Sequence, residues 1–136
     1  MNKEDGYYMR VEKRKIRYLK ETGYRANMKK VVEPYLRKYR RCGSFTSFDG
    51  TRIFYCTYVP KHARGSIVIS HGFSEFAQKY HEVIYYFLQA GYCVFIPEHR
   101  GHGRSGRRLR NLEKVYVRSF TILLTNMCRS RTYSVK

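Results

Sequence analysis

Two short segments of the chain collect the residue types that carry out nucleophilic and acid–base chemistry. Residues 70–75 read Ser-His-Gly-Phe-Ser-Glu, and residues 97–106 read Pro-Glu-His-Arg-Gly-His-Gly-Arg-Ser-Gly. A serine hydroxyl can attack a carbonyl carbon when a base activates it, and histidine and glutamate side chains can transfer protons. These two segments are therefore the candidate site, and the elements around them must bring them together.

The cysteines indicate no further chemistry. No pair has the Cys-x-x-Cys spacing with which two thiolates reach one metal ion or form a redox pair. The four are Cys42, Cys56, Cys93 and Cys128. We expect free thiols in a reducing cytosol, no metal and no cofactor.

The residues between the two segments predict a βαβ unit. Residues 66–70 form a short apolar run, typical of a strand buried on both faces of a parallel sheet. A helix follows and is closed by Gly91, and residues 92–96 form a second buried strand. The apolar side of the helix is expected to hold Phe76, Tyr80, Val83, Ile84, Phe87 and Leu88. The class is α/β, and both segments follow carboxyl ends of parallel strands, where such sheets bind ligands.

A β-hairpin is predicted before this unit. Residues 44–48 and 51–59 are rich in β-branched and aromatic side chains, and the two-residue turn Asp49-Gly50 joins them. Aspartate and glycine tolerate the positive φ angles of a type I′ turn, so this spacing favours two antiparallel strands.

The first part of the chain reads as a basic helical segment. Apolar residues recur there at helical spacing, at Met28, Val32, Tyr35 and Tyr39. Pro34 either begins a new helix or kinks a longer one, so we expect a helix over about residues 34–41.

Taken in order, these motifs resemble a known superfamily. The chain is similar to α/β-hydrolases in four features that occur in the same order. These are a strand ending in His71-Gly72-Phe73, a helix of this length, the strand entry Ala90-Gly91-Tyr92 and the segment 98–105. The similarity is to their monoacylglycerol lipase, lysophospholipase and serine-aminopeptidase-like branch, and it covers about residues 43–119. It implies a partial α/β-hydrolase sheet, formed by the N-terminal hairpin and the first parallel βαβ unit and preceded by the basic helical segment.

The resemblance also implies roles for the two segments. The backbone N–H of Phe73 would supply half of an oxyanion hole, with His71 and Gly72 supporting its loop, since a glycine before the donor lets the backbone approach a carbonyl. The alternative is that His71-Gly72 is only a tight strand-to-helix turn. In the second segment the resemblance implies structural roles for Glu98, His99, Arg100, Gly101, His102, Gly103 and Ser105.

The catalytic serine motif of this superfamily is absent from the sequence. Gly-x-Ser-x-Gly is matched neither by residues 72–76, which lack the final glycine, nor by residues 103–106, whose second glycine comes one place early. We therefore expect the N-terminal half of a serine hydrolase, inactive alone because nucleophile, acid and histidine base are missing. The intact relative would hydrolyse a carboxylic ester, a lipid monoester.

Three parts of the chain are expected. Residues 1–42 form the basic helical extension, residues 43–120 the hydrolase part, and residues 121–136 an atypical basic tail. The tail follows a stretch in which the resemblance fades, and from residue 114 to the end there is no Asp, Glu, Gly or Pro. We interpret it as out-of-frame sequence, the alternative being an ordinary basic tail.

The net charge suggests a competing function. With 28 Lys and Arg against 10 Asp and Glu, the chain carries +18, and Arg104, Arg107, Arg108 and Arg110 could neutralise phosphates of a nucleic acid or an anionic surface. No known binding module accompanies this charge, so no nucleic-acid partner is expected. A further alternative is an unfolded fragment, although 43% hydrophobic residues is typical of a folding chain.

Two other interpretations are disfavoured by spacing and length. Residues 101–106 match Gly-x-Gly-x-x-Gly, but four residues separate them from Ile96, and no carboxylate follows Glu113 to bind a ribose. No apolar stretch reaches the roughly 20 residues that cross a bilayer, and no signal peptide is visible. We expect a cytoplasmic chain without a transmembrane segment; its oligomeric state is left open.

Overall fold

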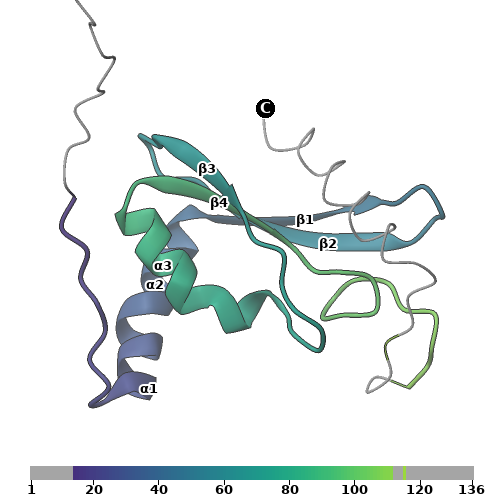
Figure 1. The fold of residues 1–136 in the computed structure, drawn as a ribbon, viewed down its shortest axis with the longest axis horizontal. Helices are drawn as coiled ribbons and strands as arrows, with labels where there is room; N and C mark the ends of the chain where they lie inside the picture. Colours follow the sequence, from purple (N-terminus) through teal and green to yellow (C-terminus); the bar gives the residue numbers. More distant parts are fainter. Residues whose placement is uncertain (1–13, 112–114, 116–136) are drawn as a thin grey trace, which may run out of the picture.

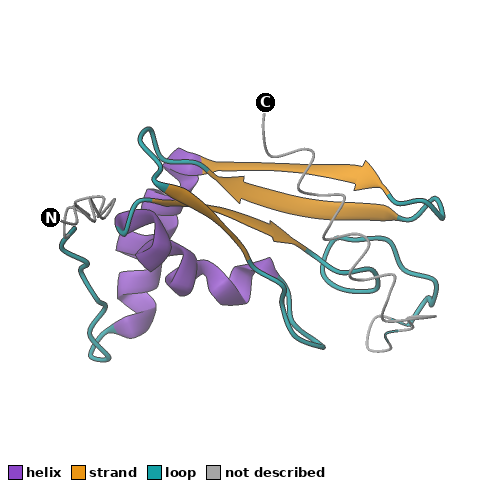
Figure 2. Cartoon of the chain, turned by 45° about the horizontal axis from the view of Figure 1, so that its top comes forward, coloured by secondary structure: helices purple, strands orange, loops and turns teal. Residues whose placement is uncertain are grey.

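A computed structural model of the chain describes residues 14–111 and 115. Its described strands form one mixed sheet in the order β1-β2-β4-β3, and the helices lie against one face of it (Figures 1 and 2). The strands are β1 (Arg40–Thr46), β2 (Arg52–Tyr58), β3 (Gly65–Val68) and β4 (Tyr92–Pro97). The predicted α/β class, with a hairpin followed by a parallel βαβ unit, is confirmed, since β1 and β2 are antiparallel and β3 and β4 parallel.

The hairpin forms with a different turn from the one predicted. The Gly50 N–H donates to the Ser47 carbonyl at 3.0 Å and the Ser47 N–H to the Thr51 carbonyl at 2.8 Å, so residues 48–50 make a three-residue connection. Gly50 has φ of 80°, whereas Asp49 is not among the residues with positive φ. The two-residue type I′ turn is therefore wrong, and a type I turn followed by a left-handed glycine takes its place.

The hairpin register also corrects the expectation of free thiols. Cys42 lies opposite Cys56 in the ladder, and the two form a disulfide across the strands with a Cα–Cα distance of 4.1 Å. Cys93 is a free cysteine, and Cys128 lies outside the described residues. Cysteine spacing in the sequence does not indicate this pair, because the hairpin brings the two residues together.

The basic helical segment is longer than predicted at its start and shorter at its end. It comprises α1 (Tyr24–Asn27), a π-helical turn η1 (Met28–Val32) and α2 (Glu33–Tyr39). Pro34 falls in the first turn of α2, directly after the wider π turn, where its missing N–H is tolerated. The expected helical residues Arg40 and Arg41 instead pair with Tyr58 and Thr57 in the sheet.

The βαβ unit forms as predicted, but its burial differs. A 3₁₀ turn η2 (Ala77–Tyr80) leads into α3 (His81–Gln89), and Gly91 closes the helix with φ of 86°. The buried stripe of α3 is His81, Ile84, Tyr85 and Leu88, whereas Val83 is exposed. His81 enters the core because its ring nitrogens contact the Tyr58 hydroxyl and the Glu33 carboxylate.

The apolar run predicted β3 to be buried on both faces, but the structure shows that it is not. Its alternate residues are exposed, and Val68 keeps 39% of its surface. β3 lies at an edge of the described sheet, where it pairs with β4 alone among the described strands. The predicted tail, residues 121–136, lies outside the described residues, and in the described part no helix is long and apolar enough to cross a membrane.

One core joins the helices to the sheet. Val32 and Leu36 from the N-terminal helical segment pack with Tyr58 and Ile96 from the sheet and with Ile84 and Leu88 from α3. Each of these six side chains retains at most a trace of exposed surface, so the helical segment is part of the same folded body as the sheet.

Candidate functional site

The two sequence segments lie side by side, because they follow neighbouring parallel strands. The chain leaves β3 through Ile69, whose N–H still donates to the Phe95 carbonyl at 2.9 Å, and then forms the loop that contains His71. It leaves β4 into the loop that contains His99 and His102. The structure thus brings together the two segments that were predicted from the sequence to form the site (Figure 1).

His71 and His99 connect the two loops through their backbones and rings. The Nδ1 atom of His71 lies 2.8 Å from the Gly72 carbonyl and its Nε2 accepts the His99 N–H at 2.9 Å, so His71 is held as a neutral ring protonated on Nδ1. The Nε2 atom of His99 lies 3.0 Å from the Ser70 hydroxyl. Burial lowers the pKa of His71, and burial together with the neighbouring His71 and His102 lowers that of His99 to about 4.

His102 holds the turn that follows His71-Gly72. Its Nδ1 lies 3.0 Å from the Arg100 carbonyl, and its Nε2 accepts the Ser74 N–H at 3.2 Å. Ser74 has φ of 62°, the only described residue other than glycine with a positive value. With the Glu75 N–H donating to the Gly72 carbonyl at 3.2 Å, residues 72–75 form a type II turn. No sequence motif signalled Ser74, because serine is not a residue that such a turn favours.

Glu75 and Tyr80 fix the other side of this turn. The Gly72 N–H donates to Glu75 Oε2 at 2.9 Å, and the Tyr80 hydroxyl donates to the same oxygen. These two donors lower the pKa of Glu75, with the Tyr80 hydroxyl as the larger cause. The first turn after β3 is therefore held on both sides, by Glu75 and by His102.

The Phe73 N–H lies at the second position of this turn. The side chain of Phe73 is 74% exposed, and its ring packs edge-on against that of His102 with centroids 5.7 Å apart. Among residues 14–111 and 115 its N–H has no hydrogen-bond acceptor. A backbone donor at a fixed position, not engaged by the described protein, is suited to stabilising negative charge that develops on a bound oxygen.

Glu98 is enclosed within the second loop. It is 1% exposed, and its carboxylate accepts the Ala77 N–H at 3.2 Å and the Arg104 N–H at 2.6 Å. The Arg104 guanidinium lies 3.6 Å away. A Cβ atom at Gly103 would lie 2.2 Å from Glu98 Oε2, and Gly103 has φ of 48°, so glycine is required there. Glu98 therefore organises the loop through backbone amides.

Ser105 and Arg100 attach the same loop to the hairpin. The Ser105 hydroxyl donates to the Glu98 carbonyl at 2.5 Å and accepts the Phe54 N–H at 2.8 Å, both inside the protein. The Gly101 N–H donates to the Gly106 carbonyl at 2.9 Å and closes the loop. Arg100 donates to Asp49, and this guanidinium holds the pKa of Asp49 far below its usual range. From its place in the sequence Asp49 was predicted only as a turn residue, and no local pattern indicates its partner Arg100.

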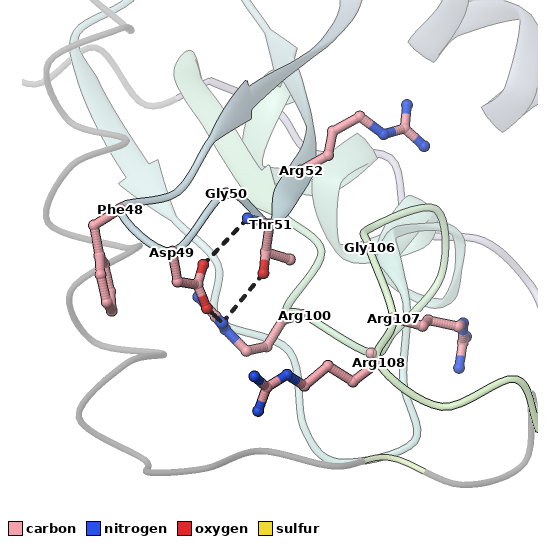
Figure 3. Close-up of a pocket in the computed structure, with 10 residues that line it drawn as sticks. Phe48, Asp49, Gly50, Thr51, Arg52, Arg100, Gly106, Arg107 and Arg108 are labelled. Carbon is pink, nitrogen blue, oxygen red and sulfur yellow. Dashed lines mark hydrogen bonds and ion pairs between the residues drawn. The ribbon is translucent and has the colours of Figure 1, made fainter.

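Cavities border the second loop on several sides. One of about 350 Å³ is lined by Phe76, Gln78, Glu98, Gly103 and Arg104. One of about 480 Å³ lies between the hairpin turn and residues 100–108 (Figure 3). Another of about 200 Å³ faces the first loop and is bordered by Ser74 and His102. Within the described residues no group of three or more His, Cys, Asp or Glu side chains is arranged to hold a metal ion.

Known proteins are similar to this chain over part of its length. The family model described as serine aminopeptidase, S33, matches residues 61–130. A monoacylglycerol lipase of Mycolicibacterium smegmatis is 41% identical over 85 residues, which are 60% of this chain and 30% of that protein. Lysophospholipase L2 of Escherichia coli is 34% identical over 76 residues, covering 56% and 22%.

A solved structure shares the fold. The thioesterase domain from the curacin biosynthetic pathway superposes with a TM-score of 0.52 at 24% identity, covering 69% of this chain and 33% of that one. The chain spans less than a third of the length of the two curated relatives.

Proposed function

The chain belongs to the serine aminopeptidase S33 family of α/β-hydrolases, and we propose that it supplies the oxyanion-binding part of a serine ester hydrolase. The observation that carries this proposal is the Phe73 N–H, which is held in a fixed turn by Glu75 and His102. When a nucleophile attacks an ester carbonyl, the oxygen gains negative charge, and a preorganised N–H stabilises that charge without reorganisation. His71 and Gly72 support the donor, and residues 98–105 support the turn.

The substrate class follows from the relatives. One is named a monoacylglycerol lipase and another lysophospholipase L2. We therefore propose a carboxylic ester of a lipid with a single acyl chain as the substrate of the complete enzyme. Family membership favours this function over the nucleic-acid alternative raised by the net charge.

These 136 residues are proposed to be catalytically incomplete on their own. The sequence contains no Gly-x-Ser-x-Gly motif, and without an activated serine no acyl-enzyme forms by this mechanism. The division into residues 1–42, 43–120 and 121–136 also stays a proposal. So does a cytoplasmic location, against which the Cys42–Cys56 disulfide argues, because reducing compartments rarely keep structural disulfides.

An ester assay with a chimera tests the proposal. Residues 43–111 of this chain would replace the corresponding part of the M. smegmatis monoacylglycerol lipase, which supplies the catalytic serine motif. We expect the chimera to hydrolyse a short-chain p-nitrophenyl ester and the 136-residue chain alone to show no turnover. In the chimera, Phe73→Pro should lower kcat by about 10²–10³-fold, because it removes the N–H at a turn position that proline fits.

The matched control is Phe73→Ala, which keeps the N–H and removes the ring. It should retain kcat within a few fold, since the proposed donor is the backbone. Equal kcat for the proline and alanine variants would refute the role of Phe73. Turnover by the 136-residue chain that a serine-reactive fluorophosphonate abolishes would refute its incompleteness.

A further inference from the structure

The N-terminal helical segment has a basic outer face. α1, η1 and α2 follow one another directly over residues 24–39 (Figure 1), and Val32 and Leu36, four residues apart in sequence, are buried in the core. Helix positions that are three, four, seven or eight residues apart lie on the same side. Six exposed residues share the side opposite the buried pair and define the outer face: Ala26, Lys30, Val31, Pro34, Arg37 and Lys38.

The three cations of the outer face have no anionic partner within residues 14–111 and 115. The side chains of Lys30, Arg37 and Lys38 are exposed, and they take part in none of the ion pairs or side-chain hydrogen bonds of these residues. The one carboxylate of residues 24–39, that of Glu33, lies 2.5 Å from the Nδ1 atom of the buried His81. Glu33 is therefore engaged with the core side, and the positive charge of the outer face is left for an external partner.

Two further cations border the outer face. Arg25 and Lys29 are exposed, and neither forms an ion pair in the part of the chain that the structure describes. With them the helical segment presents five exposed basic side chains between positions 25 and 38. Clusters of about four to eight Lys and Arg on a helix are typical of segments that bind anionic lipid headgroups.

The side chains between the cations favour a lipid bilayer over a nucleic acid. Ala26, Val31 and Pro34 are apolar, and Val31 is 43% exposed. Apolar side chains leave water when a helix lies at the boundary between headgroups and acyl chains. Proteins that bind nucleic-acid bases instead use amide, hydroxyl or aromatic side chains, and the outer face has none of these.

We propose that the outer face docks on the surface of an anionic lipid bilayer. Lys30, Arg37 and Lys38 contact the headgroup phosphates and carboxylates, while Val31 and Pro34 lie towards the acyl boundary. A helix on a charged surface contacts many headgroups at once, so the binding depends on the charge of the lipid and not on one headgroup. The inference does not depend on the proposed ester hydrolysis, because the outer face lies outside the two loops of the site.

Co-sedimentation of the 136-residue chain with lipid vesicles tests the proposal. We expect binding to vesicles of phosphatidylcholine and phosphatidylserine, no binding to phosphatidylcholine alone, and weaker binding as added salt screens the charges. The triple variant Lys30→Gln/Arg37→Gln/Lys38→Gln should lower the partition coefficient about a hundredfold, as expected for the loss of three charges at an anionic surface. Lys30→Arg/Lys38→Arg, which keeps these charges, should bind like the parent chain.

The matched control is Lys61→Gln/Arg108→Gln/Arg110→Gln. It removes the same charge from exposed positions outside the helical segment, and it includes two members of the arginine cluster that suggested a nucleic-acid partner. This variant should retain vesicle binding within a few fold. Equal weakening by the two triple variants overturns the proposal, because the attraction then comes from the net charge of the chain and not from the outer face.

A duplex DNA of mixed sequence, titrated at the same salt concentration, tests the other class of polyanion. Binding of the duplex without binding of the phosphatidylserine vesicles overturns the proposal in favour of a nucleic acid. The absence of vesicle binding at low salt also overturns it. All of the substituted side chains are exposed, and a far-UV circular dichroism spectrum equal to that of the parent chain assigns a loss of binding to the removed charges.

Discussion

At the scale of single residues, the site depends on histidine rings that accept hydrogen bonds from the backbone. His71 and His102 each use Nε2 to accept a backbone N–H from the opposite loop, the His99 N–H and the Ser74 N–H. A protonated ring would present a second donor to that N–H and lose the contact. The His71 and His99 rings also pack together, with centroids 4.4 Å apart, so a proton on one opposes a proton on the other.

This arrangement predicts a loss of stability in mild acid. The pKa of His99 is lowered from 6.5 to about 4 in the folded chain, so between these values the unfolded chain binds the proton and the folded chain does not. The free energy of unfolding should therefore be highest above about pH 6.5 and should fall as the pH drops towards 4. This residue accounts for a fall of about 3 kcal/mol at most. Urea unfolding followed by circular dichroism at several pH values measures it.

A matched pair of variants assigns the effect. His99→Gln removes the titrating group and should flatten this part of the pH dependence, while His62→Gln, at an exposed position, should leave it as in the parent chain. An unchanged slope in the His99 variant would contradict the assignment.

The sequence predicted which residues meet in the site but not how they bond. The hydrophobic pattern predicted two parallel strands that pair with each other. The site residues, His71, Gly72, Phe73 and residues 98–105, follow these strands. The contacts of Arg100 with Asp49 and of His102 with Ser74 span 51 and 28 residues. No local spacing encodes contacts of that range, because they depend on the exact path of two loops and a turn.

At the scale of elements, the β1–β2 hairpin positions much of the molecule. Its turn supplies Asp49 to Arg100, and its ladder places Cys42 opposite Cys56. The hairpin was predicted from Asp49-Gly50, yet its turn has three residues and β1 starts at Arg40. The early start of β1 arises because backbone pairing continues as far as the strands have partners. The longer turn arises because the register places Thr46 opposite Arg52 and leaves an odd number of residues between them, which propensity alone does not determine.

Reduction of the disulfide should destabilise the chain. The bond closes a loop between positions 14 apart in sequence, and a closure of that length restricts the unfolded chain by about 3 kcal/mol. We expect thermal unfolding at lower temperature in the presence of a reductant, and for Cys42→Ala/Cys56→Ala without it. Cys93→Ser is the control, since it keeps the disulfide and should retain the sensitivity to reductant. Alkylation of Cys42 and Cys56 in the native, unreduced protein would contradict the pairing.

At the scale of the whole molecule, charge and sheet topology have opposite effects on self-association. The +18 charge of the chain repels other copies at low ionic strength. Strand β3, however, lies at the edge of the described sheet, and its outward-facing residues include the partly exposed Val68. Edge strands with apolar side chains are templates for pairing with another chain. The balance should therefore depend on salt, which screens the charge and leaves the strand edge unaffected.

Sedimentation velocity at low and high salt tests this balance. We expect the chain to be monomeric at low salt and to self-associate as salt is added, and we expect Val68→Lys to suppress that association by placing a charge on the edge strand. Val31→Lys is the matched control, because it adds the same charge away from the sheet. Val31 lies in the π-helical turn η1 and is 43% exposed, against 39% for Val68. If both variants suppress association equally, net charge and not the β3 edge controls self-association. If the parent chain stays monomeric at high salt, the β3 edge does not pair with another chain.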